Sequence, residues 1–189
     1  MATTFASRAR TMTAEEFLVE YEGVPGRWEL VEGIPKLMAG GSAAHSMVIV
    51  NIAAALRQKL RGSSCRPHGP DMGLRISDSE VRYPDAAIYC DRRDLERDPL
   101  TTREFRHPSV IFEVLSPSTA RYDREAKLRA YAGVEGLRMV VLLDPGTRGV
   151  EVYRPGEAGF DGGPLEAEVD LVSTEPPFVL TRDEMFALD

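Results

Sequence analysis

"IFEVLSPSTARYDREAKLRAYA", residues 111–132, decides how the chain is interpreted. The apolar pattern from Val110 to Leu115 predicts a buried strand, and Glu113 stands in its middle. An unpaired charge inside such a strand is costly, because burial removes the water that solvates the carboxylate. The residues that follow predict a loop and then a helix with a single lysine, Lys127. Glu113 therefore either has a structural ion-pair partner or binds a metal ion.

The overall composition is that of a soluble globular domain. The 189 residues are 43% hydrophobic and 28% charged, which suits one domain with a full-sized core. No apolar run approaches the ~20 residues that cross a bilayer, so we expect no membrane association. Residues 1–17 lack the apolar core of a signal peptide. Cys65 and Cys90 form no CxxC motif, and we expect two thiols in a reducing cytoplasm.

Negative charge is concentrated near the C-terminus. The formal net charge is −7, with −8 in residues 151–189 and +1 in residues 1–150. A negative net charge argues weakly against nucleic acid as a partner. Because the body of the chain is close to neutral, a nucleic-acid-binding face is still compatible with the sequence.

Capping motifs and apolar periodicity predict an α/β fold, with a mixed β-sheet flanked by helices. Thr13 and Thr181 begin capping-box patterns that predict short helices. Ser42 is expected to cap a helix that runs to about residue 61, with His45 on its apolar face, and another helix is expected at 120–132. Strands are expected at 27–31, 34–38, 65–76, 81–89, 109–115, 138–145, 149–155 and 165–172. No linker divides the chain, so we expect a single domain.

Asp85 is a second carboxylate in a strand pattern. In "VRYPDAAIYC", residues 81–90, alternation places it on one face with Val81 and Ala87. Two carboxylates from adjacent strands, Asp85 and Glu113, can converge on one cation. Mg²⁺ prefers one or two carboxylates together with water and phosphate oxygens. Such an ion activates water and neutralises charge on a phosphodiester.

Lys127 is one of only three lysines among 23 basic residues. A compact ammonium can orient water or stabilise a leaving oxyanion in a way that a guanidinium does poorly. In the predicted helix Lys127 shares a face with Leu128 and Tyr131, which favours an inward direction. The alternative is a solvent-exposed ion pair with Asp123, four residues earlier.

Structural explanations exist for each of these residues. Asp85 could cap a turn, Glu113 could pair with Arg124, and His45 could be a satisfied residue at a helix start. Other chemistries lack their motifs, since the sequence has no GxSxG, no phosphate-binding loop, no GxGxxG and no zinc-type histidine spacing. Two strand carboxylates with a lysine and an inward histidine together favour a metal site.

The chain also contains RWELVEG (27–33), a helix expected to begin near residue 45, YPDAAIY (83–89), VVLLDP (140–145) and VEVYR (150–154). Together with residues 111–132, these segments resemble the Uma-type family, bacterial proteins predicted to be restriction endonucleases within the PD-(D/E)XK nuclease superfamily. The resemblance covers residues 12–155 and implies a restriction-endonuclease-like core there, followed by an acidic extension at 156–189. It also implies that Asp85 and Glu113 bind metal and that Glu29 and His45 line the same pocket.

One position departs from the superfamily pattern. The usual lysine lies two residues after the glutamate, where this chain has Leu115. Lys127, from the following helix, is the nearest replacement. We expect an endonuclease that hydrolyses DNA with Mg²⁺ or Mn²⁺, in which Asp85 and Glu113 hold the metal and Lys127 orients the attacking water.

Two further expectations concern the alternative function and assembly. Leu115 and the net charge favour a non-catalytic nucleic-acid-binding or regulatory protein that keeps the nuclease fold. We also expect a homodimer, because a two-fold enzyme matches a two-stranded substrate and the strand at 149–155 offers an edge for pairing.

Overall fold

The computed structural model describes residues 10–116, 120–157, 159–165, 168–171, 174 and 177–187. The helices are α1 (Ala14–Glu20), α2 (Ala43–Lys59), α3 (Arg92–Leu95), α4 (Ala120–Tyr131) and α5 (Arg182–Phe186). The strands are β1 (Trp28–Val31), β2 (Ile34–Leu37), β3 (Arg66–His68), β4 (Gly73–Ser77), β5 (Glu80–Arg82), β6 (Ala86–Tyr89), β7 (Glu104–Phe105), β8 (Pro108–Val114), β9 (Met139–Asp144), β10 (Gly149–Gly156), β11 (Gly159–Leu165), β12 (Val169–Leu171) and β13 (Phe178–Leu180). Within these described ranges, no helix is long and apolar enough to cross a membrane.

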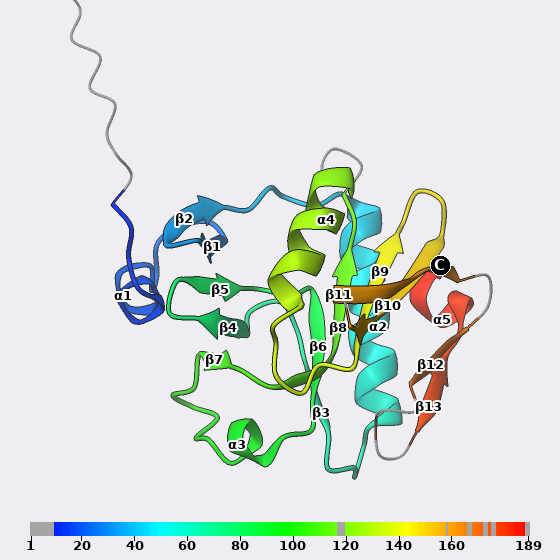
Figure 1. Ribbon diagram of the computed structural model, residues 1–189. Coiled ribbons are helices and arrows are strands. Elements are labelled where there is room, and N and C mark those ends of the chain that lie inside the picture. Colours follow the sequence, from blue (N-terminus) through cyan, green and yellow to red (C-terminus); the bar gives the residue numbers. More distant parts are fainter. Residues whose placement is uncertain are drawn as a thin grey trace, which may run out of the picture.

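The strands of the described residues form three sheets (Figure 1). A six-stranded sheet has the order β11-β10-β9-β8-β6-β3, and a five-stranded sheet has the order β2-β1-β5-β4-β7. The pairing of β8 with β9 is parallel, while β8 pairs with β6 in antiparallel fashion, so the larger sheet is mixed. The strands β12 and β13 form a small antiparallel pair. The predicted α/β fold with a mixed sheet flanked by helices is confirmed.

Alternation along β8 explains the layers of the domain. Phe112 and Val114 point into one apolar cluster with Ile52 of α2, and α5 contributes to the same cluster. Ile111 and Leu115 point to the opposite face, where they cluster with Tyr131 of α4. Successive residues of a strand face opposite ways, so the six-stranded sheet is covered by α4 on one side and by α2 and α5 on the other (Figure 1).

The predicted helix starts are confirmed. Thr13 and Glu16 form a capping box at α1, and Thr181 and Glu184 form another at α5. The Ser42 hydroxyl accepts a hydrogen bond from the backbone N–H of His45 at the start of α2. These local signals locate the helices because each one satisfies N–H groups that the first helical turn leaves unpaired.

The strand expected at 81–89 is two strands in two different sheets, which corrects the prediction. β5 belongs to the five-stranded sheet and ends at Arg82, while β6 belongs to the six-stranded sheet and begins at Ala86. Pro84 lies between them, and a proline cannot donate a backbone hydrogen bond to a sheet. The strand expected at 65–76 is likewise divided into β3 and β4. Asp85 therefore lies at the crossing between two sheets.

The predicted exposed edge at 149–155 is also wrong. β10 pairs with β9 on one side and with β11 on the other, so both of its edges are occupied. The sequence at 159–165 is rich in glycine, and for that reason its strand was not expected there. Of the strand predicted at 165–172, Leu165 ends β11 and Val169–Leu171 form β12, while residues 166, 167 and 172 lie outside the described residues.

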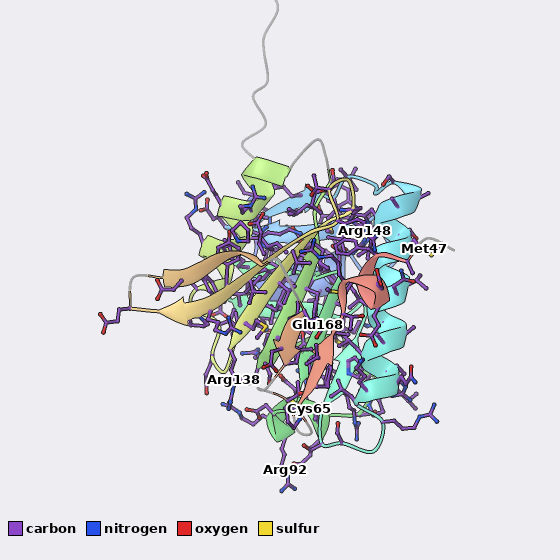
Figure 2. The ribbon with its side chains drawn as sticks, turned by 90° about the vertical axis from the view of Figure 1, so that its right-hand side faces the viewer. Met47, Cys65, Arg92, Arg138, Arg148 and Glu168 are labelled. Carbon is purple, nitrogen blue, oxygen red and sulfur yellow. A yellow bond between two sulfur atoms is a disulfide. The ribbon has the colours of Figure 1, made fainter. Side chains whose placement is uncertain are left out.

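Cys65 and Cys90 form a disulfide, contrary to the expected pair of thiols. Cys65 precedes β3 and Cys90 follows β6, and these strands are antiparallel with Arg66 opposite Tyr89. The register therefore brings the two cysteines opposite each other, with Cα atoms 4.2 Å apart. Figure 2 shows Cys65 toward the end of α2 remote from Met47. The spacing in sequence could not reveal this contact, because it depends on strand pairing.

Candidate active site

Glu113 is buried at the middle of the larger sheet, with 1% of its surface exposed. The Tyr131 hydroxyl donates a hydrogen bond to Oε1, and the Lys127 ammonium donates one to Oε2 at 2.6 Å. Burial raises the pKa of the Glu113 carboxyl above its usual value, against the opposing effects of Lys127 and Tyr131. Both partners come from α4, so this helix supplies the polar contacts that compensate a buried carboxylate.

Lys127 points inward, as the helical face shared with Leu128 and Tyr131 predicts. Its side chain is 15% exposed. Burial works against its charge, but the carboxylates of Glu113 and Asp85 raise the pKa of Lys127 above its usual value, so the ammonium stays protonated. The side chain of its expected alternative partner, at position 123, lies outside the described residues.

The structural partner suggested for Glu113, Arg124, pairs elsewhere. Its guanidinium Nε donates to Oε2 of Glu151 on β10 at 2.9 Å. Arg124 and Lys127 therefore reach two different strands of the sheet from the same helix, and only the lysine contacts Glu113.

Asp85 lies next to Glu113 because of the register between β6 and β8. Ala86 is opposite Phe112, and Oδ2 of Asp85 accepts a hydrogen bond from the backbone N–H of Val114 at 2.8 Å. Burial raises the pKa of the Asp85 carboxyl, while Lys127 lowers it. The charge of Asp85 in turn raises the pKa of Glu113. The two carboxylates are thus close enough to repel each other.

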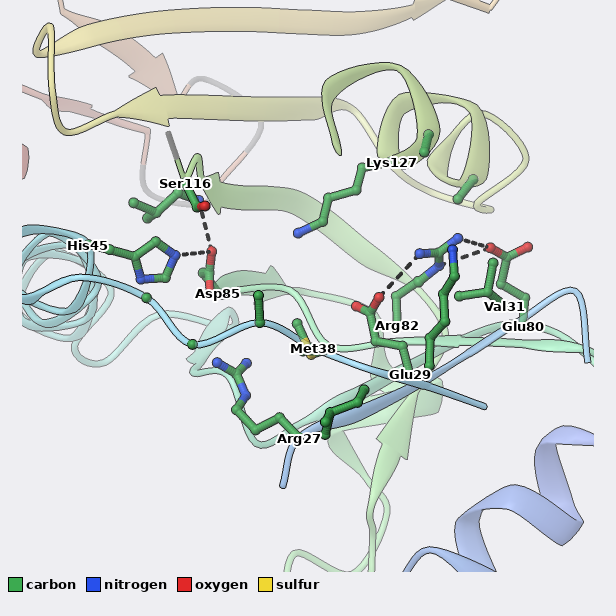
Figure 3. Close-up of a pocket in the computed structure, with 18 of the residues that line it drawn as sticks. Arg27, Glu29, Val31, Met38, His45, Glu80, Arg82, Asp85, Ser116 and Lys127 are labelled. Carbon is green, nitrogen blue, oxygen red and sulfur yellow. Dashed lines mark hydrogen bonds and ion pairs between the residues drawn. The ribbon is translucent and has the colours of Figure 1, made fainter. Parts of the chain in front are cut away.

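His45 extends from the first turn of α2 toward Asp85, with its Nε2 3.7 Å from Oδ2 (Figure 3). Burial lowers the pKa of the imidazole below its usual value, so His45 is neutral at pH 7. A Cβ atom at Gly41 would lie 2.5 Å from Nδ1 of the ring. Glycine at position 41 therefore leaves the space that this orientation of His45 requires.

Glu29 is held by the five-stranded sheet. Its carboxylate accepts hydrogen bonds from Nη1 of Arg82 and from the backbone N–H of Tyr83, each at 3.2 Å. Arg82 also binds Glu80 at 2.6 Å. Glu29 raises the pKa of Asp85 through its charge, so it lies within the electrostatic field of the other residues without being their hydrogen-bond partner.

A cavity of about 630 Å³ connects these side chains (Figure 3). Glu29, His45, Asp85 and Lys127 line it together with Arg27. Glu113 does not line the cavity itself, but its carboxylate contacts the ammonium of Lys127, which does. The five side chains predicted from the sequence therefore lie in or next to one cavity, although each comes from a different segment of the chain.

The donor set fits a Mg²⁺ or Mn²⁺ ion that completes its shell with other ligands. In the described part of the chain, no group of three or more His, Cys, Asp or Glu side chains is arranged to hold a metal ion. Asp85 and Glu113 offer two carboxylates, and hard cations such as Mg²⁺ often take only one or two from the protein and the rest from water and phosphate. The mutual repulsion of the two carboxylates is what a cation would relieve.

Two site residues were not anticipated as such. Tyr131 was noted only as an apolar residue beside Lys127, yet its hydroxyl binds Glu113. Its spacing, four residues after Lys127 on a helix, is the signal that could have found it. Arg82 has no comparable signal, since its contact with Glu29 depends on β1 lying beside β5.

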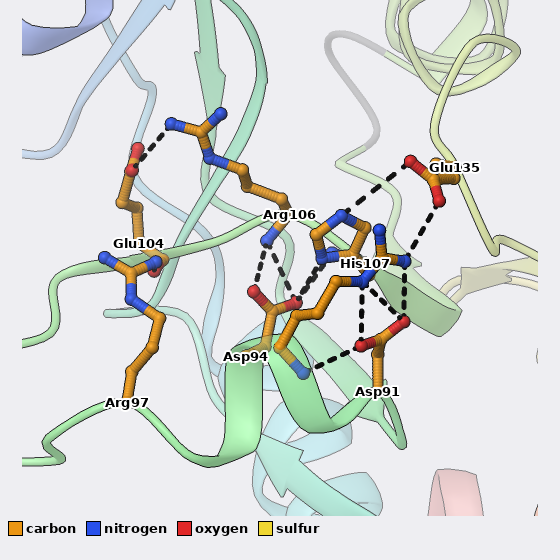
Figure 4. A network of polar contacts seen from close by, with 8 residues as sticks. Asp91, Asp94, Arg97, Glu104, Arg106, His107 and Glu135 are labelled. Carbon is orange, nitrogen blue, oxygen red and sulfur yellow. Dashed lines mark hydrogen bonds and ion pairs between the residues drawn. The ribbon is translucent and has the colours of Figure 1, made fainter.

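A second polar cluster, around Asp94, is structural (Figure 4). Asp94 is 2% exposed, and its carboxylate accepts hydrogen bonds from the backbone N–H groups of Arg106 and His107. Nδ1 of His107 also lies 3.3 Å from this carboxylate. Asp94 thereby links α3 to the segment that enters β8, where it satisfies N–H groups that no strand partner reaches.

Comparisons with known proteins agree with this architecture. Two uncharacterized proteins of Synechocystis sp. (strain ATCC 27184 / PCC 6803 / Kazusa) are similar in sequence. One, slr1290, is 30% identical over 149 residues, which are 78% of this chain and 76% of the relative. The other, sll1609, is 28% identical over 146 residues, which are 77% and 81% of the two chains.

A solved structure shares the fold. It is described as a "putative nuclease belonging to DUF820" from Anabaena variabilis ATCC 29413, and it matches with a TM-score of 0.71 at 19% identity, over 90% of this chain and 97% of the other. The model of the Uma2 family, described as "Putative restriction endonuclease", matches residues 14–182, which extends past residue 155, where the resemblance in sequence ends. The chain therefore belongs to the Uma2 family.

Proposed function

We propose that the protein is an endonuclease that hydrolyses DNA phosphodiester bonds in the cavity lined by Asp85 and Lys127, with Mg²⁺ or Mn²⁺. Family membership and the fold support a nuclease. The observation that carries the proposal is the cluster of Asp85, Glu113 and Lys127. Two buried carboxylates that repel each other beside a buried ammonium cost free energy of folding, and such groupings are common at sites of chemistry.

Each residue has a role in this proposal. Asp85 and Glu113 hold the divalent ion, which supplies Lewis-acid neutralisation of charge on the scissile phosphate. Lys127 stays protonated and donates its N–H groups to a water molecule or a phosphate oxygen at the cavity. His45 is neutral at pH 7 and can accept the proton that an attacking water loses. Glu29 keeps Arg82 in place at the opposite wall.

The alternative is a nucleic-acid-binding or regulatory protein that keeps the fold without catalysis. Leu115 occupies the usual lysine position of the superfamily and is 4% exposed in the apolar cluster under α4. Lys127 is also engaged with Glu113 at 2.6 Å. If the lysine serves only to neutralise that carboxylate, the cavity binds a phosphate backbone without cleaving it.

A nuclease assay separates the two functions. Purified protein is incubated with single-stranded DNA, double-stranded DNA and RNA in Mg²⁺, Mn²⁺ or EDTA, and the same substrates are given to Asp85→Asn. Cleavage that needs the metal and disappears in Asp85→Asn supports the endonuclease. Asp170→Asn is the matched control, because this carboxylate is exposed on β12. Binding of the substrates without cleavage of any of them supports the alternative.

The proposal includes a single domain, a cytoplasmic location and a homodimer. Contacts between α2 and α5 support one domain formed by the core at 12–155 and the extension at 156–189, since Asn51 Nδ2 donates to the carbonyl of Ala187 at 2.7 Å and Lys59 pairs with Glu184 at 2.6 Å. Because β10 is enclosed, β11 is the edge strand that a second copy would extend. A monomer mass by light scattering at tens of micromolar would rule out the dimer.

A further inference from the structure

A second cavity, of about 330 Å³, lies beside the first, and Arg27 lines both of them. Its wall is aromatic. Trp28, Tyr21 and Tyr83 line it, and the rings of Tyr21 and Trp28 meet edge to face with centroids 5.1 Å apart. Tyr21, Trp28 and Tyr83 are each partly exposed, so their rings can contact a ligand. We call this cavity the aromatic pocket.

The indole ring of Trp28 is fixed before any ligand arrives. Its Nε1–H donates to the backbone carbonyl of Pro25 at 3.1 Å. Gly26, between them, has a φ of +99°, and a Cβ atom there would lie 2.7 Å from the side chain of Leu37 and 3.4 Å from Nε1. The polar atom of Trp28 is therefore satisfied within its own turn, which leaves the ring surface for apolar or stacking contacts. A rigid aromatic surface loses little conformational entropy when it binds.

The charges around the aromatic pocket favour an anion at one end only. Arg103 pairs with Glu22 at the rim. Arg27 donates to the carbonyl of Pro70 at 3.4 Å, and none of the ion pairs between the described residues includes its guanidinium. Arg27 lines both cavities, and its positive charge lowers the pKa of Asp85 and of His45. A negatively charged group that enters next to Arg27 thus lies between the aromatic pocket and the candidate active site.

We propose that the aromatic pocket binds one unpaired nucleobase of single-stranded DNA, with the adjoining phosphate on Arg27. This inference rests on the proposed function, because it specifies the substrate of the same site as a strand with an unstacked base. Base stacking on aromatic side chains, next to a positive charge that follows the backbone, is the general way in which proteins hold single strands. The carboxylate of Asp71 lines the same pocket and can accept a hydrogen bond from the amino group of a base.

The pocket contains its own reporter, because Trp28 is the only tryptophan of the chain. The full-length protein is titrated with a single-stranded DNA octamer of mixed sequence in EDTA, where no metal-dependent cleavage takes place. We expect saturable quenching of the tryptophan fluorescence. A blunt duplex of the same sequence should bind at least tenfold more weakly, since its bases are already stacked and paired. Absence of quenching, or equal quenching by the duplex, would overturn the proposal.

Substitutions test the stacking directly, with the anisotropy of a labelled octamer as the readout. Loss of one base–aromatic contact weakens binding by about fivefold to 150-fold. Trp28→Leu should therefore bind at least about fivefold more weakly, while Trp28→Phe should stay within about threefold of wild type. Phe160→Leu, on β11 and outside the aromatic pocket, is the control for loss of an aromatic ring. Equal affinity of Trp28→Leu and wild type would contradict the proposal.

Arg27 gives an independent measurement. Arg27→Gln should lower the slope of log Kd against log salt concentration by about 0.7, the value for one phosphate contact on a single strand. An unchanged slope would remove the phosphate from the proposal. Far-UV circular dichroism and urea denaturation of each variant check that it is folded, so that weaker binding is attributed to the pocket.

The outcomes separate this inference from the proposed function. If the octamer quenches Trp28 and Trp28→Leu weakens binding, while no nucleic acid is cleaved in Mg²⁺ or Mn²⁺, the nucleobase site stands and the endonuclease fails. If DNA is cleaved in a manner that depends on Asp85, while Trp28→Leu binds as wild type does, the endonuclease stands and the nucleobase site fails.

Discussion

The ammonium of Lys127 on α4 lies 2.6 Å from the carboxylate of Glu113 on β8, which is almost completely buried, while the Lys127 side chain is 15% exposed. The ion pair offsets the free-energy cost of removing the Glu113 carboxylate and the Lys127 ammonium from water. Removal of one partner leaves an unpaired charge in the interior, whereas removal of both leaves a neutral pair of side chains. The cost of a substitution at either position therefore depends on what stands at the other.

Lys127→Met should lower the free energy of unfolding by about 3 kcal/mol at pH 7, because Glu113 is left without its cation. The double variant Lys127→Met/Glu113→Gln should recover most of this loss, to within about 1 kcal/mol of wild type. Urea denaturation measures both. Lys59→Met is the matched control, since Lys59 lies at the same 2.6 Å from Glu184 but in a more exposed pair, and it should cost less than about 1 kcal/mol. Equal losses at positions 127 and 59 would contradict the burial argument.

Tyr131→Phe removes one of the two hydrogen bonds to Glu113. A hydrogen bond to a charged group contributes about 1.5–3 kcal/mol, and we expect a loss of stability in this range. Because the hydroxyl also orients a proposed metal ligand, affinity for Mn²⁺ in calorimetry should fall by about tenfold or more. Tyr153→Phe, which removes a similar hydrogen bond to Glu151 at a more exposed position, should leave metal affinity unchanged. An effect of the same size in both variants would count against the assigned role.

Much of this arrangement can be read from local sequence signals. The capping boxes at Thr13 and Thr181 locate two helices, and the spacing of Lys127 and Tyr131 on one face predicts that both point to the sheet. The disulfide of Cys65 and the enclosure of β10 could not be predicted in this way. They depend on which strands pair and in which register, and these choices are made by contacts between distant segments.

The same distinction applies within the candidate site. Glu113 stands out in the sequence because a charge interrupts an apolar strand. The position of Asp85 between two sheets does not, because "VRYPDAAIYC" alternates as a single strand would. Glu29 lines the cavity, and its hydrogen bond to Arg82 follows from the pairing of β1 with β5.

Gly41→Ala should displace the imidazole of His45, because the added methyl group would lie 2.5 Å from Nδ1. We expect a changed His45 pKa in NMR titration and, if the protein is a nuclease, a slower reaction. Gly40→Ala is a close control, since a Cβ atom at Gly40 has no neighbour within 4 Å. If both variants titrate as wild type does, the contact between Gly41 and His45 does not set the position of the ring.

The pH dependence of stability should report the buried carboxylates. Burial raises the pKa of Asp85 from its usual 3.8, so the folded protein binds this proton more tightly than the unfolded chain does. In EDTA the free energy of unfolding should therefore fall as pH rises from about 3.8 to the folded-state pKa, by about 1.4 kcal/mol for each unit of the shift, and level off above it.

The amide of Asp85→Asn cannot titrate, so the free energy of unfolding of this variant should not show this decrease with pH. The variant should therefore be more stable than wild type at pH 7 without metal. Urea denaturation between pH 4 and pH 8 measures the two curves, with Asp170→Asn as a control for an exposed carboxylate. Parallel curves for wild type and Asp85→Asn would show that burial does not raise this pKa.

Reduction of the disulfide should lower the free energy of unfolding by about 3 kcal/mol, because the Cys65–Cys90 bond closes a loop with a sequence separation of 25 residues. Denaturation with and without a reducing agent measures the difference, and Cys65→Ser/Cys90→Ser should behave as the reduced protein in both conditions. A double variant that still responds to the reducing agent would show that another effect is responsible.

The proposed cytoplasmic location and the disulfide are in tension, since that compartment keeps most thiols reduced.

The crossing of the chain from β5 to β6 places the walls of the cavity on two different sheets. Glu29 and Arg82 belong to one sheet, Glu113 to the other, and Asp85 lies on the short segment that joins them. A change in the angle between the two sheets would therefore change the distance between the walls of the cavity. A ligand that contacts both walls would oppose such a change and hold the two sheets at one angle.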